Sequence, residues 1–232
     1  MNTGINLTTL LYALAAGIIP SLIWLFFWTR EDHSHEPKRL LTGLFLCGML
    51  GTIVALFCEK IVTGFALDTY HKYLYWAIIE EFIKFTTVAI IAFRSSSFDE
   101  PIDAMIYFVT VALGFAALEN TLFILFPFST GNITAGIITG NLRFIGATLI
   151  HIICSGIIGF AIGYTFYKKW LTKILSVIIA FIIASGIHTI FNLSIVNTIP
   201  NEAIKVFAWV WVAAVMLIVL FEEVKSVRPK LI

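Results

Sequence analysis

Charged residues are scarce in this chain, and their scarcity limits the classes of protein to which it can belong. Lysine, arginine, aspartate and glutamate make up 12% of the 232 residues, whereas soluble domains carry roughly 25%. Apolar residues make up 59% and fall in runs of about twenty, the length a helix needs to cross the hydrocarbon core. The net charge is only +1, which argues against nucleic-acid binding, because such proteins concentrate basic surface. An integral protein of the lipid bilayer is therefore predicted.

Cysteine is scarce too, and its spacing is uninformative. Cys47, Cys58 and Cys154 lie inside or at the edge of apolar runs. They share no metal-binding spacing and suggest no disulfide framework, so we expect them to be small packing residues. Linkers, low-complexity tracts and shifts of composition are also missing. Residues 1–232 are therefore expected to form a single transmembrane domain.

The apolar runs predict an all-α, polytopic bundle of about seven transmembrane helices. The first run has no basic residues before it, so we expect a true span rather than a cleavable signal. The predicted spans are Leu7–Trp28, Leu40–Cys58, His71–Phe93, Ile102–Phe126, Gly140–Phe166, Ile174–Val196 and Ile204–Phe221.

Basic residues predict the orientation, because short cytoplasmic loops are enriched in lysine and arginine. One set follows the first, third, fifth and seventh spans: Arg30, Lys38, Arg39, Arg94, Lys168, Lys169, Lys173, Lys225, Arg228 and Lys230. The opposite side has Lys60, Lys72 and Lys205, with Arg143 near its surface. The N-terminus is therefore predicted outside the cell and the C-terminus in the cytoplasm.

Glycines recur in the fifth span at three- and four-residue spacing, as Gly156, Gly159 and Gly163. Because glycine has no side chain, this spacing is typical of a helix face that a neighbouring helix approaches closely.

The third span carries three ionisable residues near its middle: Glu80, Glu81 and Lys84. Each costs about 2.5–3.5 kcal/mol at the bilayer centre even on a lenient insertion scale, so all three need partners. Glu80 precedes Lys84 by four residues, the favourable order for a helical ion pair. Glu81 points about 100° away from Glu80, so the two carboxylates cannot face one partner equally. A salt-bridged clamp that only fixes helix packing is the simpler alternative.

Spans four to six carry further polar residues at similar positions: Glu119 and Asn120, His151 and Ser155, and His188 and Asn192. Each histidine precedes its polar companion by four residues, one turn along the same face. A single membrane histidine is usually a hydrogen-bonded packing residue, whereas this repeated pairing favours ligands or bases whose rings are oriented by a neighbour.

The glutamates and histidines of these four spans are predicted to lie at similar depths in the membrane. With a rise of 1.5 Å per residue, the carboxylates and histidines lie about 10–16 Å below the outer ends of their predicted spans. We therefore expect Glu80, Glu81, Glu119, His151 and His188 to surround one cavity in the outer half of the bilayer.

Two kinds of hydrolysis suit such a cavity. In a zinc enzyme, His151, His188 and a glutamate, for which we take Glu81, would bind the ion and leave one position open to water. Without a metal, a glutamate in apolar surroundings would act as general base toward water. The histidines and Asn192 would then stabilise the oxyanion. These residue types alone do not decide between the two.

A proton- or cation-coupled transporter is the alternative, because ion pathways use the same residue types. Transporters often contain internal repeats and broken helices, but we find no convincing repeat, and the third span has no internal glycine or proline. The discriminating feature is whether the polar residues converge on one pocket or line a path that reaches both faces. A purely structural scaffold would leave the clustered charges unexplained.

Taken in order, four motifs resemble those of the PrsW family of bacterial intramembrane proteases and, more remotely, the type II CAAX prenyl proteases. They read Glu80-Glu81-x-x-Lys84, Phe115-x-x-x-Glu119-Asn120, His151-x-x-x-Ser155-x-x-x-Gly159-x-x-x-Gly163 and His188-x-x-x-Asn192. They cover the third to sixth spans, so the resemblance implies a catalytic core over about 71–196.

The resemblance implies a multi-pass endopeptidase of the bacterial cytoplasmic membrane. Its substrate would be membrane-anchored, such as an anti-sigma factor, and would be cut near the extracytoplasmic surface. Catalytic roles would fall to Glu80, Glu81, Glu119 and His188, with His151 as a further candidate, and supporting roles to Lys84, Asn120, Ser155 and Asn192. Two residues depart from the pattern: Phe123 stands where many members have tyrosine, and Thr189 where a small residue is expected.

Overall fold

The structure, a computed structural model, describes residues 6–30, 36–197 and 203–229, and within these ranges it contains helices and no strand. A five-residue π-helix, Arg143–Ala147, joins α5 to α6. The α-helices are α1 (Leu7–Thr29), α2 (Lys38–Thr63), α3 (Thr69–Ile91), α4 (Pro101–Ser129), α5 (Ile133–Leu142), α6 (Thr148–Tyr164), α7 (Trp170–Asn197) and α8 (Ala203–Lys225). The predicted all-α class is confirmed.

Six helical segments of the described chain are long and apolar enough to cross a membrane, with α5, the π-helix and α6 acting as one span from Ile133 to Tyr164. Helix α3, the third predicted span, is not among these six, because its three central charges lower its apolar character. It packs between α2 and α7 in the same bundle. The polytopic membrane bundle is therefore confirmed, and the predicted orientation stays a prediction.

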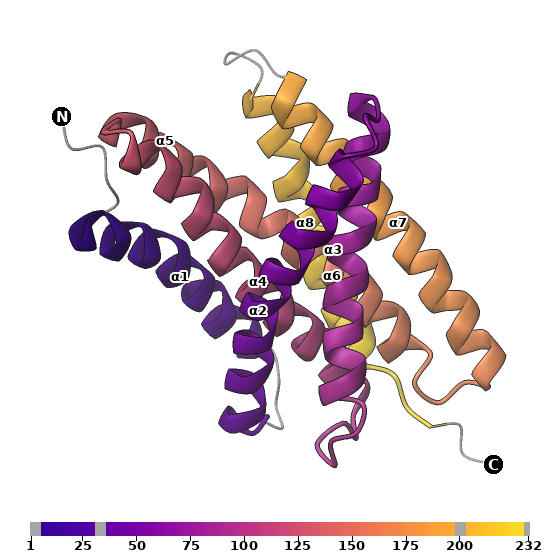
Figure 1. Cartoon of the computed structure of the whole chain (residues 1–232). Coiled ribbons are helices and arrows are strands. Elements are labelled where there is room, and N and C mark those ends of the chain that lie inside the picture. Colours follow the sequence, from indigo (N-terminus) through magenta and orange to yellow (C-terminus); the bar gives the residue numbers. More distant parts are fainter. Residues whose placement is uncertain (1–5, 31–35, 198–202, 230–232) are drawn as a thin grey trace.

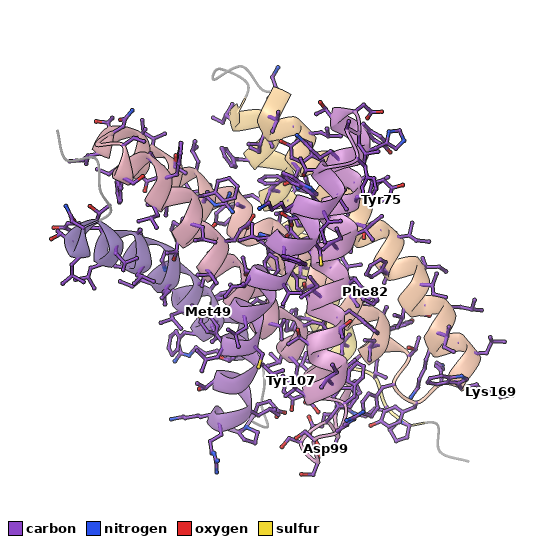
Figure 2. All side chains as sticks on the ribbon, in the orientation of Figure 1. Met49, Tyr75, Phe82, Asp99, Tyr107 and Lys169 are labelled. Atoms are coloured by element: carbon purple, nitrogen blue, oxygen red, sulfur yellow. The ribbon has the colours of Figure 1, made fainter. Side chains whose placement is uncertain are left out.

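Helix α4 is the centre of the bundle. Residues 101–117 are all buried, because α1, α2 and α6 pack around this helix. The outer helices instead expose large apolar side chains such as Leu50, Phe82 and Val212, as expected of surfaces that face lipid. Figure 2 shows the polar ends of the bundle, with Asp99 and Lys169 near one end and Tyr75 towards the other end of α3.

Helices α3 and α7 pack against each other and then diverge. Figure 1 shows α7 crossing α3 and moving away from it towards the end of the bundle where α7 begins. The two helices thus enclose different spaces at their two ends.

The predicted close packing at the glycines of α6 is confirmed. A Cβ added to Gly159 would lie 2.8 Å from the Cα of Met105 in α4, and one added to Gly163 would meet the carbonyl oxygen of Pro101. Gly156 instead faces Leu217 of α8. Any larger residue at position 159 would therefore push α6 away from the central helix.

Candidate active site

The charges of α3 are buried, with at most 4% of Glu80, Glu81 or Lys84 exposed. Lys84 Nζ donates to Glu81 Oε1 over 2.8 Å and lies 3.7 Å from Glu80 Oε2. The expected ion pair of Glu80 with Lys84 is therefore present, and Glu81 makes the shorter contact with the same ammonium. Lys84 also lies 2.8 Å from His151 Nδ1 and 4.5 Å from the ring centre of Phe115. These contacts hold the ammonium on the side of the helix to which Glu81 points.

Both histidines are oriented by carboxylates from other helices. His188 Nδ1 lies 3.0 Å from Glu81 Oε1, and His151 Nε2 lies 2.7 Å from Glu119 Oε2. Ser155 donates to Glu81 Oε2 over 3.2 Å rather than to a histidine. The expectation that Ser155 orients the ring of His151 is therefore wrong, because the Ser155 hydroxyl is used by Glu81 of another helix.

These contacts indicate which ring nitrogens carry protons. A carboxylate accepts hydrogen bonds, so His188 donates from Nδ1, and in the neutral ring its Nε2 carries no proton. His151 donates from Nε2 to Glu119, and its Nδ1 accepts from Lys84.

Arg143 binds Glu119, the glutamate that α4 contributes to the site. It begins the π-helix, an element found frequently at functional sites, and donates to Glu119 Oε2 over 2.7 Å and to Asn120 Oδ1 over 2.5 Å. Asn120 in turn donates to Thr148 Oγ over 2.9 Å. The Arg143 guanidinium also stacks 4.0 Å from the ring centre of Phe123. The departure at position 123 therefore keeps an aromatic face without needing a hydroxyl.

A cavity of about 460 Å³ opens beside these groups. Five of the residues singled out from the sequence line it: Glu80, Glu119, His151, His188 and Asn192. Glu81, Lys84 and Ser155 lie behind them and reach the cavity through their contacts with the histidines and with each other.

The sequence interpretation missed two lining residues. Glu59 of α2 lines the cavity, but the second span was drawn to end at Cys58. Arg143 was treated only as a basic residue near the outer surface. An arginine at the depth of an acidic residue on the preceding span is the signal that could have found it, because intramembrane charges pair.

Two groups of side chains among the described residues could hold a metal ion. Glu80, His151 and His188 form one, and Glu81, Cys154 and His188 form the other, each with its ligand atoms within 4.8 Å of one another. Glu80, rather than the predicted Glu81, therefore joins both histidines. Cys154, which we expected only to pack, lies in the second group.

The first group fits a metal better. Glu80 Oε2 is buried without a hydrogen-bond partner and lies 3.8 Å from both His151 Nδ1 and His188 Nε2. This separation is too long for a hydrogen bond and less than twice a zinc–ligand bond of about 2.0–2.2 Å. In the second group, Glu81 already binds Lys84, Ser155 and His188.

The helical membrane bundle, with buried carboxylates and histidines around one cavity, has the residues that a membrane-embedded hydrolase needs. Residues 36–221 match the sequence profile described as PrsW family intramembrane metalloprotease. The chain belongs to this family, and the resemblance seen in its motifs is confirmed.

Curated relatives agree. The chain is 29% identical to the protease PrsW of Geobacillus kaustophilus over 154 residues, 65% of each chain. It is 28% identical to that of Oceanobacillus iheyensis over 190 residues, 79% of this chain and 82% of the relative. For Bacillus subtilis the identity is 25% over 169 residues, 68% of this chain and 74% of the relative. No solved structure matches the chain.

Proposed function

We propose that this protein is an intramembrane endopeptidase that hydrolyses a peptide bond of a membrane-anchored protein, such as an anti-sigma factor, near the extracytoplasmic side. One observation carries the proposal. Glu80, Glu119, His151 and His188 come from four helices and line one cavity. The buried Glu80 Oε2 has no hydrogen-bond partner and lies 3.8 Å from a ring nitrogen of each histidine.

Glu80, His151 and His188 would hold the metal, and two histidines with one glutamate are a donor set that catalytic zinc uses. Bound there, zinc would lower the pKa of a water molecule and polarise the substrate carbonyl.

Glu81 serves the site by orienting His188. Glu81 Oε1 accepts a hydrogen bond from His188 Nδ1 over 3.0 Å. The other ring nitrogen, Nε2, faces Glu80. Such carboxylate–histidine pairs fix the tautomer of metal ligands and raise their basicity.

Lys84 balances the negative charge behind the site. It is completely buried and lies between Glu81 and His151, 2.8 Å from each. If His151 binds the metal through Nδ1, the Lys84 ammonium can no longer donate a hydrogen bond to that nitrogen. The ammonium then keeps its contact with Glu81. The buried lysine thus stays neutralised whether or not a metal is bound.

Glu119 is the carboxylate we assign to take the proton of the attacking water. Both of its contacts, with Arg143 and His151, are made by Oε2, which leaves Oε1 for the cavity. Arg143 and Asn120 hold the group in place. The protonated acid can then return the proton to the leaving amine, as general acid–base catalysis requires.

The position of the cavity supports an enzyme over a transporter. Its lining includes Tyr73 to Glu80 on α3 and His188 to Val196 on α7, which belong to one half of each helix. The other half of the α3–α7 contact is lined by Phe85, Phe93 and Phe181, an aromatic region that does not suit an ion path.

The test is cleavage of a membrane-anchored substrate by the purified protein in liposomes. We expect activity that is lost with a chelator, restored by zinc, and absent from Glu80→Gln. Glu223→Gln, an exposed change on α8, is the matched control and should cleave normally. Cleavage that survives the chelator would reject the metal, and normal cleavage by Glu80→Gln would reject the site.

A further inference from the structure

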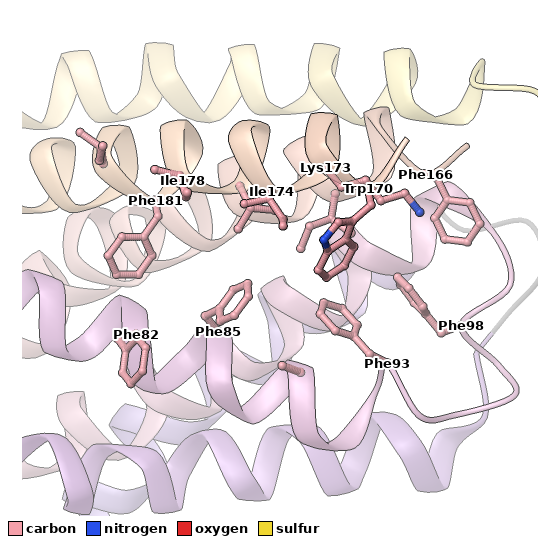
Figure 3. Close-up of a pocket in the computed structure, with 14 residues that line it drawn as sticks. Phe82, Phe85, Phe93, Phe98, Phe166, Trp170, Lys173, Ile174, Ile178 and Phe181 are labelled. Carbon is pink, nitrogen blue, oxygen red and sulfur yellow. The ribbon is translucent and has the colours of Figure 1, made fainter. Parts of the chain in front are cut away.

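A second cavity, a groove of about 750 Å³, lies where α3 and α7 diverge. Figure 3 shows its lining, in which Phe85 of α3 and Phe93, just beyond the end of this helix, face Ile174, Ile178 and Phe181 of α7. Phe98 and Phe166, from the connections that follow α3 and α6, close one end. The groove uses the same helix pair as the candidate active site but shares no lining residue with it.

The groove has a polar group at one end only. Of the described residues that line it, Lys173 alone carries a charge, and it lies near the exposed indole of Trp170. The Lys173 Nζ atom is 5.6 Å from the ring centre of Phe166. Lys168 and Lys169 are exposed on the adjacent connection, so positive charge gathers where the apolar groove ends.

The positive charge at this end of the groove has no acidic partner in the part of the chain that the structure describes. Among the described residues, the ion pairs that form include none with Lys168, Lys169 or Lys173. Tryptophan and lysine at the end of an apolar segment are typical of the headgroup level of a membrane. An anion that is attached to an apolar chain would match both parts of the groove.

We propose that the groove binds one anionic phospholipid, with an acyl chain between α3 and α7 and its phosphate at Lys173. The volume lies within the roughly 300–1,000 Å³ of small-ligand pockets. A membrane-spanning helix about 10 Å wide and about 30 Å long occupies on the order of 2,000 Å³, so the groove is too small to enclose a substrate helix. The proposal does not depend on the proposed protease activity.

The bound lipid would act as a spacer between two helices that carry the active site. Phe85 lines the groove and directly follows Lys84, and on α7 His188 lies six residues beyond Ile182, which also lines the groove. An acyl chain that fills the groove therefore keeps the helix of Glu80 and Glu81 at a fixed separation from the helix of His188.

The experiment is native mass spectrometry of the full chain in detergent with phosphatidylglycerol or phosphatidylcholine of identical acyl chains. We expect one tightly retained phosphatidylglycerol, bound about fivefold more strongly than phosphatidylcholine, since one lysine near an anionic headgroup contributes an effect of that size. Lys173→Gln should remove the preference, and Ala89→Phe, which fills the groove, should weaken binding of both lipids.

Two matched controls test whether the effects belong to the groove. Lys60→Gln removes an exposed lysine at the other end of the bundle, and Ala15→Phe adds the same ring to an exposed face of α1. Both should bind lipid like the unaltered chain. Circular dichroism and gel filtration confirm that each variant is folded, and Lys173→Gln tests the charge without altering the core.

Equal retention of the two lipids by the unaltered chain would overturn the proposal, as would an equal loss of preference in Lys60→Gln. A third result would also overturn it. If the groove variants bind lipid normally but lose photo-crosslinking between α3 and the membrane segment of a substrate, the groove holds substrate rather than lipid.

Discussion

The candidate active site and the contact between α4 and α6 are adjacent but are stabilised in opposite ways. At the contact, backbones touch at Gly159, and residues 101–117 of α4 are all buried. At the site, these two helices help to line a cavity of about 460 Å³, and Glu80 Oε2 has no hydrogen-bond partner. Close packing beside the cavity thus supports a group of buried charges that would be costly alone. Substitutions in the cavity should reduce activity, and those in the contact should reduce stability.

The largest expected effect is on activity alone. Glu119→Gln keeps the size of the side chain and can still accept a bond from Arg143, but it cannot take a proton from water. We expect cleavage to slow by about 10²–10⁴-fold, the usual contribution of a general acid or base, with a nearly unchanged free energy of unfolding. Kinetics in liposomes and unfolding in mixed micelles measure the two. A loss of stability without a loss of cleavage would show that Glu119 supports the fold rather than the chemistry.

Glu81→Gln should affect both properties, because this residue connects the cavity to the buried interior. It leaves Lys84 buried with weaker compensation, which costs about 3–5 kcal/mol when one partner of a buried pair is removed. The poorer orientation of His188 should lower activity about 10–100-fold. Ser155→Ala is the control: it removes one bond to Glu81 and should cost only about 1 kcal/mol.

Gly159→Ala should lower stability without a direct effect on chemistry. The added methyl group would lie 2.8 Å from Met105 Cα, and such overpacking typically costs about 1–3 kcal/mol. Gly186→Ala in α7 meets nothing within 4 Å and should not destabilise the protein. Equal unfolding free energies for the two variants would show that α6 and α4 are not in close contact.

The smallest effect is expected at Phe123. Phe123→Leu removes the ring beneath Arg143 and should cost about 0.5–1 kcal/mol, the value of an exposed cation–π contact. Phe123→Tyr keeps the ring and should match the unaltered chain in cleavage rate and stability. A marked gain of activity in Phe123→Tyr would show that a hydroxyl at this position takes part in the chemistry.

The helices could be predicted because their apolar runs are continuous. The third span was drawn as His71–Phe93, and α3 covers Thr69–Ile91. The span drawn from Gly140 instead starts at Ile133 and contains a π-helix at Arg143–Ala147. Apolar content reports how long a helix is, but it does not report a local change in hydrogen-bond register.

The site was predictable in depth but not in pairing. Counting residues from the span ends groups Glu80, Glu81, Glu119 and both histidines, and all of these except Glu81 line one cavity in the structure. The rotation and tilt of each helix decide which atoms meet. The spacing of residues within one helix does not determine this rotation and tilt. The structure groups Glu80, rather than Glu81, with both histidines, and His151 contacts Glu119 rather than Ser155.

The most direct test of the account is the metal content of two purified variants that differ in which glutamate is changed. Glu119→Gln should keep about one zinc ion per chain, like the unaltered protein, while losing cleavage. Glu80→Gln should lose both, because Glu80 completes the donor set with His151 and His188. Retention of zinc in Glu80→Gln, or its loss in Glu119→Gln alone, would contradict the assignment of ligand and base.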